Sequence, residues 1–292
     1  MAMVRAKQQA RGSYRFFAAT MNEEMERRFA LEADLRRALA RDELVLYYQP
    51  RIEARGGRVT GVEALLRWRH PDGGLMTPGE FIPLAEETGL IVPIGEWVLS
   101  AACARARQWK EQGFDLRVSV NLSARQFAEK TLVEDVARAL RSSGLAPEAL
   151  ELEVTETLVM ANPAQAAQTL EELKGLRLRL SLDDFGIGYS SLSYLKMFPF
   201  DALKIDRAFV AGIPADREDV AIAEAVIYLA HALGMRAVAE GVETEEQAAW
   251  LARFGCEELQ GDLLGKAMPA DALASLLREN TGGGRKGAAG VS

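Results

Sequence analysis

Acidic, amide and lysine side chains recur at the ends of short apolar runs along this chain of 292 residues. A single acid at such a place is usually a helix N-cap or a solvated turn residue. Turns, however, favour Gly, Pro, Asn, Asp and Ser over Glu and Lys, so the whole series points to one shared site. Its candidate members are Glu63, Asn121, Glu153, Asp183, Asp184, Lys204, Glu240 and Gln260.

The chain offers oxygen ligands for a metal ion and little else. It has two histidines, His70 and His231, and two cysteines, Cys103 and Cys256, which fit no CxxC pattern. Carboxylate and amide oxygens are the ligands of hard cations. The residue types therefore predict Mg²⁺ or Mn²⁺.

The adjacent carboxylates of Asp183 and Asp184 indicate two ions, because such neighbours repel in one pocket unless cations offset their charge. Consecutive strand residues point to opposite faces, so a shared pocket requires the backbone to turn at the strand end. Two ions about 4 Å apart could activate water and stabilise both oxygens of an in-line phosphoryl displacement. The residues alone leave two reactions open, metal-assisted hydrolysis and an enolase-like proton abstraction.

The elements that must position these residues are short strands alternating with longer amphipathic stretches, a pattern typical of repeated βα units. The predicted strands are 44–49, 59–67, 116–121, 150–154, 178–183, 202–205, 237–240 and 257–260. Eight strands in this alternation predict an α/β fold, a TIM-like (β/α)8 barrel. The C-terminal strand ends of a parallel barrel converge on one face, which would gather the candidate residues there.

Composition argues against several kinds of binding partner. A net charge of −7 and a pI near 5.2 argue against long nucleic acids and anionic membrane surfaces. Residues 1–20 lack the pattern of a signal peptide, and no apolar run approaches the roughly 18 residues of a spanning helix. We therefore expect a cytoplasmic segment without membrane contact, although a longer parent protein could be membrane-anchored.

Three segments are expected along the chain. The capping-box spacing of Thr20 and Glu23 predicts an opening helix over about 20–41, so the barrel domain is placed at 21–280. Residues 1–20 are expected to be a remnant of a preceding domain, a linker or a cloning artefact. The glycine-rich segment 281–292 is expected to be a disordered tail.

One block, Glu63-Ala64-Leu65-Leu66-Arg67-Trp68, resembles the signature of the EAL-domain cyclic di-GMP phosphodiesterases. Three letters would be weak evidence, but eight further blocks follow the order of that family. They are Gln49-Pro50, 81–91, 120–123, 153–156, 183–191, 203–206, 239–244 and 260–261. The resemblance covers roughly residues 30–277.

The resemblance implies a TIM-like barrel whose first strand is antiparallel, and a reaction that opens cyclic di-GMP to linear pGpG. It implies that Glu63, Asn121, Glu153 and Asp183 bind one metal ion, with Asp183 and Asp184 approaching the second. Glu63 would thereby also count among the catalytic residues.

The remaining roles implied by the resemblance concern water and substrate. Lys204 and Glu240 would lie beside the attacking water, with Glu240 as its base or as an organiser of the metal shell. Gln49, Arg67 and Gln260 would contact substrate, and the planar guanidinium of Arg67 suits a phosphate.

Outside this site, the resemblance implies that Glu156 anchors the mobile loop after the fifth strand. Residues 13–17 resemble the end of a GGDEF diguanylate cyclase domain, which would precede this segment in a longer parent, and EAL domains commonly form homodimers. Two departures from the family are Ile187 in place of Thr and the absence of aromatic residues at Asp262 and Leu264. Some EAL domains are catalytically inactive receptors for cyclic di-GMP, but these typically lack an acidic ligand that is present here.

Overall fold

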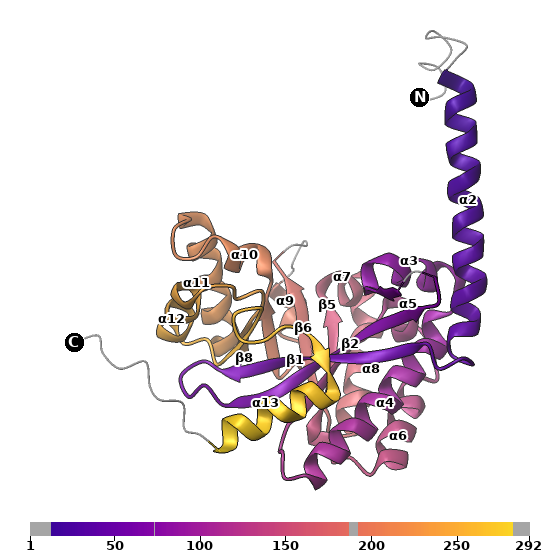
Figure 1. Ribbon diagram of the computed structural model, residues 1–292. Coiled ribbons are helices and arrows are strands. Elements are labelled where there is room, and N and C mark those ends of the chain that lie inside the picture. The colour runs from indigo at the N-terminus through magenta and orange to yellow at the C-terminus, as the bar shows by residue number, and fades with distance from the viewer. Residues whose placement is uncertain (1–12, 73, 187–191, 283–292) are drawn as a thin grey trace.

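The computed structural model describes residues 13–72, 74–186 and 192–282, with side chains described over 25–72, 74–186, 193–279. Its centre is a closed barrel of eight strands (Figure 1). These are β1 (Leu44–Glu53), β2 (Val59–His70), β4 (Arg117–Asn121), β5 (Leu150–Thr155), β6 (Arg179–Phe185), β7 (Ala202–Ile205), β8 (Arg236–Ala239) and β9 (Glu258–Gln260). Each corresponds to one predicted strand.

Seven of these strands run parallel, in the order β2-β4-β5-β6-β7-β8-β9. Strand β1 closes the barrel by pairing antiparallel with both end strands, opposing Gln49 to Glu63 of β2 and Arg51 to Gln260 of β9. The TIM-like barrel with an antiparallel first strand is thereby confirmed. Two short strands lie outside the prediction: β3 (Gly74–Met76) pairs antiparallel with the end of β2, and β10 (Met268–Pro269) pairs antiparallel with β1.

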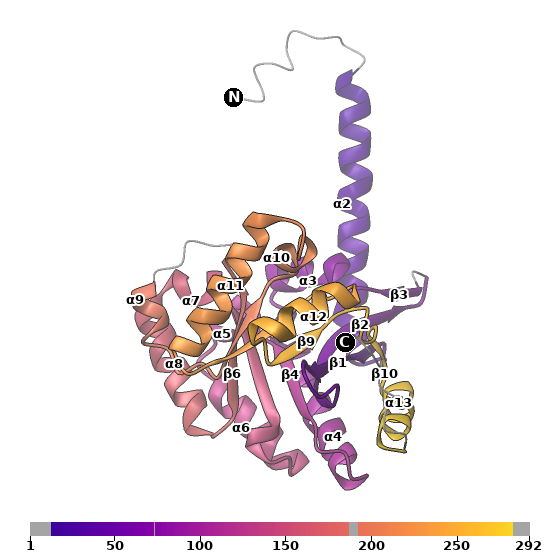
Figure 2. The ribbon, with the colours of Figure 1, turned by 90° about the vertical axis from the view of Figure 1, so that its left-hand side faces the viewer.

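Helices surround the barrel, as the two ribbon views show (Figures 1 and 2). They are α3 (Pro78–Thr88), α4 (Ile91–Glu111), α5 (Ala124–Phe127), α6 (Leu132–Ser143), the 3-10 turn η2 (Pro147–Ala149), α7 (Glu156–Ala161), α8 (Pro163–Gly175), α9 (Leu192–Leu195), α10 (Arg207–Ala211), α11 (Arg217–Ala232), α12 (Glu245–Phe254) and α13 (Ala270–Gly282). Their apolar faces pack on the outer face of the strands and form one continuous hydrophobic core.

Strand β5 shows how the sequence separates this core from the barrel interior. All but the last of its six residues are buried, and the side chains alternate between leucine or valine and glutamate. Leu150, Leu152 and Val154 belong to the hydrophobic core, whereas Glu151 and Glu153 form ion pairs with side chains from other barrel strands. Because strand side chains alternate in direction, one run builds an apolar outer layer and a charged inner one.

The opening helix, α2 (Ser13–Ala38), extends away from the barrel (Figure 2). Its last turns pack against the domain through buried Leu35 and Ala38. The helix begins before the predicted start, because a capping-box spacing does not terminate a helix and 13–20 contains no Gly or Pro. It also ends earlier than residue 41.

The proposed boundary at residue 20 falls inside α2 and stays a prediction. Residues 1–12 and 283–292 lie outside the described residues, as does most of the tail that the sequence assigns to 281–292. Among the residues that are described, no helix combines the length and apolar character needed to cross a membrane.

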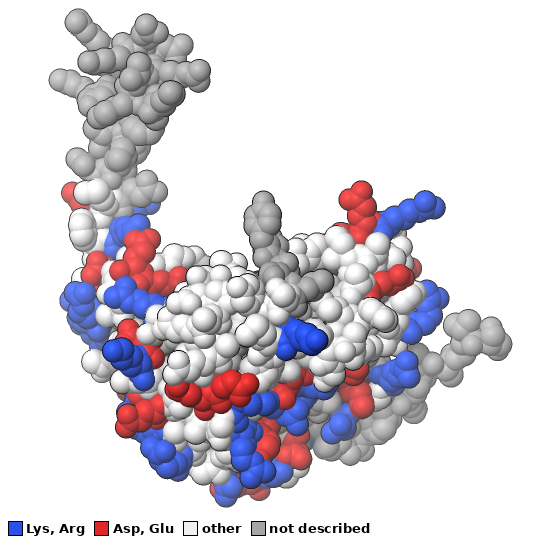
Figure 3. Space-filling model, turned by 180° about the vertical axis from the view of Figure 1, so that it is seen from behind, with Lys and Arg blue, Asp and Glu red and all other residues white. Residues whose placement is uncertain are grey.

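Acidic and basic side chains are interspersed on the surface, as the lower part of the face in Figure 3 shows. Several are joined in ion pairs, such as Arg107 with Glu111 at 2.8 Å and Lys110 with Asp115 at 2.5 Å. Exposed pairs of this kind contribute roughly 0 to 1 kcal/mol each. These surface pairs therefore add little to the stability of the domain.

Candidate active site

An open cavity of about 270 Å³ lies at the carboxyl ends of the parallel strands. Five candidate residues line it: Gln49, Glu63, Asp183, Glu240 and Gln260. Glu153 and Lys204 are fully buried and contact this group, and Asn121 reaches it through Glu63. The strand ends therefore converge as the barrel prediction requires.

The carboxylate of Glu63 is held by two side-chain amide groups, one on each oxygen. Its Oε1 accepts a hydrogen bond from Asn121 Nδ2 at 2.6 Å, and its Oε2 accepts one from Gln260 Nε2 at 2.5 Å. Gln260 Nε2 also donates to Gln49 Oε1 at 3.1 Å, and Gln49 Nε2 donates to the carbonyl of Gly265 at 3.1 Å. This chain of bonds fixes the carboxylate before any ligand arrives.

Lys204 is the cation at the centre of the site. Its Nζ lies 2.5 Å from Glu153 Oε2, 3.0 Å from Asp183 Oδ2 and 2.5 Å from Glu240 Oε1, and the side chain is completely buried. Burial alone would lower the pKa of Lys204, but the charges of Asp183, Glu153 and Glu240 outweigh it and raise the pKa well above its usual value. The residue is therefore a permanent ammonium.

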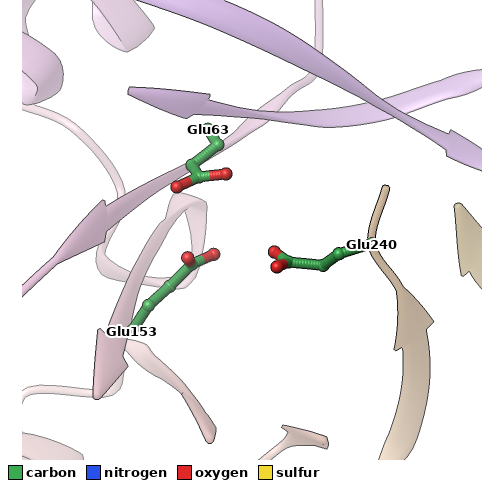
Figure 4. A group of neighbouring side chains, drawn as sticks. All are labelled: Glu63, Glu153 and Glu240. Carbon is green, nitrogen blue, oxygen red and sulfur yellow. The ribbon is translucent and has the colours of Figure 1, made fainter. Parts of the chain in front are cut away.

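Three carboxylates point toward one another across the cavity (Figure 4). Each of Glu63, Glu153 and Glu240 offers an oxygen that lies within 4.8 Å of an oxygen of the others. Burial raises the pKa of Glu153 to about 7 and that of Glu240 to about 8, with Lys204 opposing both shifts. Without a further cation, Glu153 and Glu240 therefore hold protons near neutral pH.

A β-bulge in β6 produces the turn that the pair Asp183 and Asp184 requires. The register between β6 and β7 shifts between Leu182 and Phe185, and Asp184 has a φ of 55°. Non-glycine residues seldom adopt such a φ, and bulges commonly redirect a side chain beside active sites. Asp183 thereby faces Lys204, while Asp184 lies beside Asp206.

Asp184 retains its proton more readily than an ordinary aspartate. Its pKa is raised by burial first and then by the neighbouring charges of Asp183 and Asp206. A cation bound at this position would reverse that effect.

Arg67 and Glu156 are predicted residues that do not line the cavity. Arg67 follows Glu63 on the same face of β2 but does not line the cavity; it donates to the carbonyl of Leu66 at 2.8 Å and lies 5.7 Å from the centre of the Tyr47 ring. Buried Glu156 accepts a hydrogen bond from the backbone of Gly186 at 3.0 Å, directly before the segment 187–191. That segment, with Ile187, lies outside the described residues.

Sequence reasoning missed Arg51, which donates to Glu153 Oε1 at 2.6 Å from inside the barrel. The signal that could have found it is its even spacing from Gln49, which places both side chains on one face of β1. It also missed Arg207 and Glu243, which line the cavity beside Asp262. Arg207 begins α10 directly after β7, and Glu243 lies in the loop after β8, so the period of the strands carries no signal for either.

The donor set fits hard divalent cations. Five carboxyl groups, those of Glu63, Glu153, Asp183, Asp184 and Glu240, are gathered near the ammonium of Lys204 and the guanidinium of Arg51, so acidic groups outnumber basic ones. The Oε1 atom of Gln260 is also buried with no hydrogen-bond partner among the described residues. Oxygen ligands without imidazole or thiolate at the cluster match Mg²⁺ and Mn²⁺.

Fold and site together define a class: closed barrels with one antiparallel strand and a carboxylate cluster at the carboxyl ends of the parallel strands. The EAL domain family model matches residues 32–267. The chain therefore belongs to the EAL-domain family.

Relatives of known name agree with this placement. MucR of Pseudomonas aeruginosa, a bifunctional diguanylate cyclase/cyclic di-GMP phosphodiesterase, is 50% identical over 273 residues, covering 93% of this chain and 40% of MucR. The cyclic di-GMP phosphodiesterase NbdA of the same organism is 44% identical over 279 residues, covering 95% of this chain and 36% of NbdA. The chain thus spans well under half the length of both relatives.

A solved structure of the PaMucR phosphodiesterase in complex with c-di-GMP has the same fold. It superimposes with a TM-score of 0.81 at 52% identity, covering 84% of this chain and 99% of that one.

Proposed function

We propose that this chain hydrolyses one phosphodiester bond of cyclic di-GMP to give linear pGpG, with two Mg²⁺ or Mn²⁺ ions as cofactors. The observation that carries the proposal is the cluster of Glu63, Glu153 and Glu240, whose carboxylates converge within 4.8 Å beside the buried ammonium of Lys204. The names of MucR and NbdA and the ligand of the PaMucR complex support this choice of substrate.

The residues that would hold the ions are Glu63, Asn121, Glu153, Asp183 and Asp184. Bound divalent cations would supply Lewis acidity and a nucleophilic water for phosphodiester cleavage. The hydrogen bonds to Glu63 and the Lys204 contacts to Glu153 and Asp183 orient these ligands in advance. Such preorganisation lowers the reorganisation needed during the reaction.

Lys204 and Glu240 are proposed to act at the water. They form an ion pair at 2.5 Å, and Glu240 lines the open cavity with its side chain 20% exposed. Its pKa is raised to about 8 in the metal-free site, and cations bound beside it would lower this pKa and free the carboxylate to accept a proton from water.

Substrate contacts are proposed for Gln49, Gln260 and Arg67. The first two line the cavity, whereas Arg67 lies further along β2, where its guanidinium is partly exposed. A phosphate bound by Arg67 would lie on the same face of β2 as Glu63.

Two wider proposals concern the assembly. A homodimer and a preceding diguanylate cyclase or sensor domain follow from the resemblance to EAL domains and from the bifunctional name of MucR. Sedimentation of the chain at tens of micromolar tests the first, and a monomer at that concentration contradicts it.

The decisive experiment compares the parent with Glu63→Gln. The substitution keeps the shape of the side chain but removes the charge that would hold a cation, so hydrolysis is expected to fall by orders of magnitude while some binding of cyclic di-GMP survives. Chromatography of pGpG measures hydrolysis, and calorimetry measures binding. The exposed Glu111→Gln is the control for the chemical change.

Hydrolysis by Glu63→Gln at the parent rate would remove Glu63 from the catalytic ligands. A parent protein that binds cyclic di-GMP without cleaving it would instead be a receptor module.

A further inference from the structure

Arg51 lies inside the barrel directly beneath the proposed metal site, with only 2% of its surface exposed. Its Nη2 donates to Glu153 Oε1 at 2.6 Å and to Ser119 Oγ at 2.8 Å, and its Nη1 donates to Glu151 Oε1 at 2.5 Å. One guanidinium therefore joins β1 to two neighbouring parallel strands, β4 and β5.

We propose that Arg51 is a positioning residue that fixes the Glu153 carboxylate for cation binding; this inference rests on the metal site of the proposed function. The two oxygens of Glu153 are held from different sides, Oε1 by Arg51 and Oε2 by Lys204 at 2.5 Å. Rotation of the Glu153 carboxylate about the Cγ–Cδ bond would break both contacts. Arg51 thereby selects the orientation in which Glu153 faces Glu63 and Glu240.

Arg51 is itself held by a network of buried ion pairs. Glu151 Oε2 accepts a hydrogen bond from Arg236 at 3.1 Å, and Glu258, which lies 3.7 Å from Arg51, pairs with Arg236 at 2.8 Å and with Arg117. The planar guanidinium suits this arrangement because its donors have fixed directions. These ion pairs restrict the position of the Arg51 guanidinium, which in turn restricts the carboxylate of Glu153.

The energetics of buried ion pairs favour a functional role for this network. TIM-barrel interiors are usually filled by branched apolar side chains, and replacing a buried ion pair by apolar residues is often neutral or stabilising. Charged residues at Arg51 and Glu151 are therefore not needed for packing alone. Orienting a ligand is a task that apolar side chains cannot perform.

The test uses two charge-balanced double variants of the full chain. Arg51→Met/Glu151→Gln and Arg236→Met/Glu151→Gln each remove one positive and one negative charge from the same network. The first also removes the hydrogen bond to Glu153, whereas Arg236, within the described part of the chain, pairs with Glu151 and Glu258 but not with Glu153 and serves as the matched control. Mn²⁺ affinity is measured without substrate by electron paramagnetic resonance of the free ion, and circular dichroism monitors folding.

The proposal expects Arg51→Met/Glu151→Gln to bind Mn²⁺ about 10- to 100-fold more weakly, the range typical for loss of a partner that orients a metal ligand. The Arg236 double variant is expected to lose much less affinity, because Arg51 and its hydrogen bond to Glu153 remain. Parent-like affinity in the Arg51 double variant, or equal losses in both, would overturn the proposal.

The single variant Arg51→Lys decides the question if the double variant does not fold. Lysine keeps the buried charge but lacks the planar set of donors of the guanidinium. A loss of Mn²⁺ affinity smaller than that expected for the double variant therefore supports the proposal, and an affinity equal to that of the parent contradicts it. A parent that binds Mn²⁺ without hydrolysing cyclic di-GMP removes the proposed function alone. A parent that binds no Mn²⁺ overturns the metal site and the role of Arg51 together.

Discussion

Replacing Lys204 with methionine should destabilise the metal-free protein far more than the same change at the surface. Lys204 is completely buried and lies within 3.0 Å of three carboxylates, those of Glu153, Asp183 and Glu240. At a pH above about 8, where Glu153 and Glu240 are ionised beside Lys204, its removal leaves their charges uncompensated, and breaking a buried ion pair by deleting one partner costs about 3–5 kcal/mol. At about 2–4 °C per kcal/mol for a domain of this size class, Tm should fall by roughly 6–20 °C.

Lys110→Met is the matched control. Lys110 also lies 2.5 Å from a carboxylate, that of Asp115, but its side chain is 56% exposed. An exposed pair contributes roughly 0 to 1 kcal/mol, so this variant should melt close to the parent.

Differential scanning calorimetry in the presence of a chelator compares the three proteins, and a second series adds Mn²⁺. We expect Mn²⁺ to recover part of the loss in Lys204→Met, because a divalent cation supplies the missing positive charge. A loss in Lys204→Met no larger than that in Lys110→Met would refute the electrostatic account of the site.

Three further predictions concern single groups. Arg67→Ala should weaken binding of cyclic di-GMP by about 1.5–3 kcal/mol through loss of a charge-assisted phosphate contact, as calorimetry would show, and unchanged affinity would exclude that contact. Glu156→Ala should speed hydrogen exchange at the amide of Gly186, which loses its acceptor. Finally, the metal-free protein should lose stability in urea titrations as pH rises from about 5 to 8. The folded state binds protons on Glu153 and Glu240 there that the unfolded state has released, at up to about 1.4 kcal/mol per pH unit for each group; stability that rises with pH over this range would contradict those raised pKa values.

The fold was accessible from the sequence because strand alternation and strand-end chemistry agree. All eight predicted barrel strands occur, and β7 has the predicted bounds, Ala202–Ile205. Glu63, Glu153 and Lys204 meet because the parallel strands around them share one direction. The direction of β1 came from the family resemblance alone, since a period of two is the same for parallel and antiparallel strands.

Other features depend on tertiary packing, which the period of the strands alone does not identify. The bulge at Asp184 follows from the offset between β6 and β7, which is a property of two strands together. Arg51 has an ordinary position in β1, and its importance arises from partners about 100 residues away in sequence. Sequence reasoning found the carboxylates but not the cation that orients one of them.

The coupling between fold and site follows from the alternation in β5. Shifting this strand by one residue would place Glu151 and Glu153 in the hydrophobic layer and Leu152 in the polar interior, so the register that buries the core also builds the site.

The metal-free site nevertheless holds more carboxylates than cations, and burial raises the pKa of Glu153 and Glu240. Such an arrangement sacrifices some stability for the capacity to bind divalent cations, as functional sites commonly do. Cation binding should therefore stabilise the fold most at the pH where these carboxylates have lost their protons.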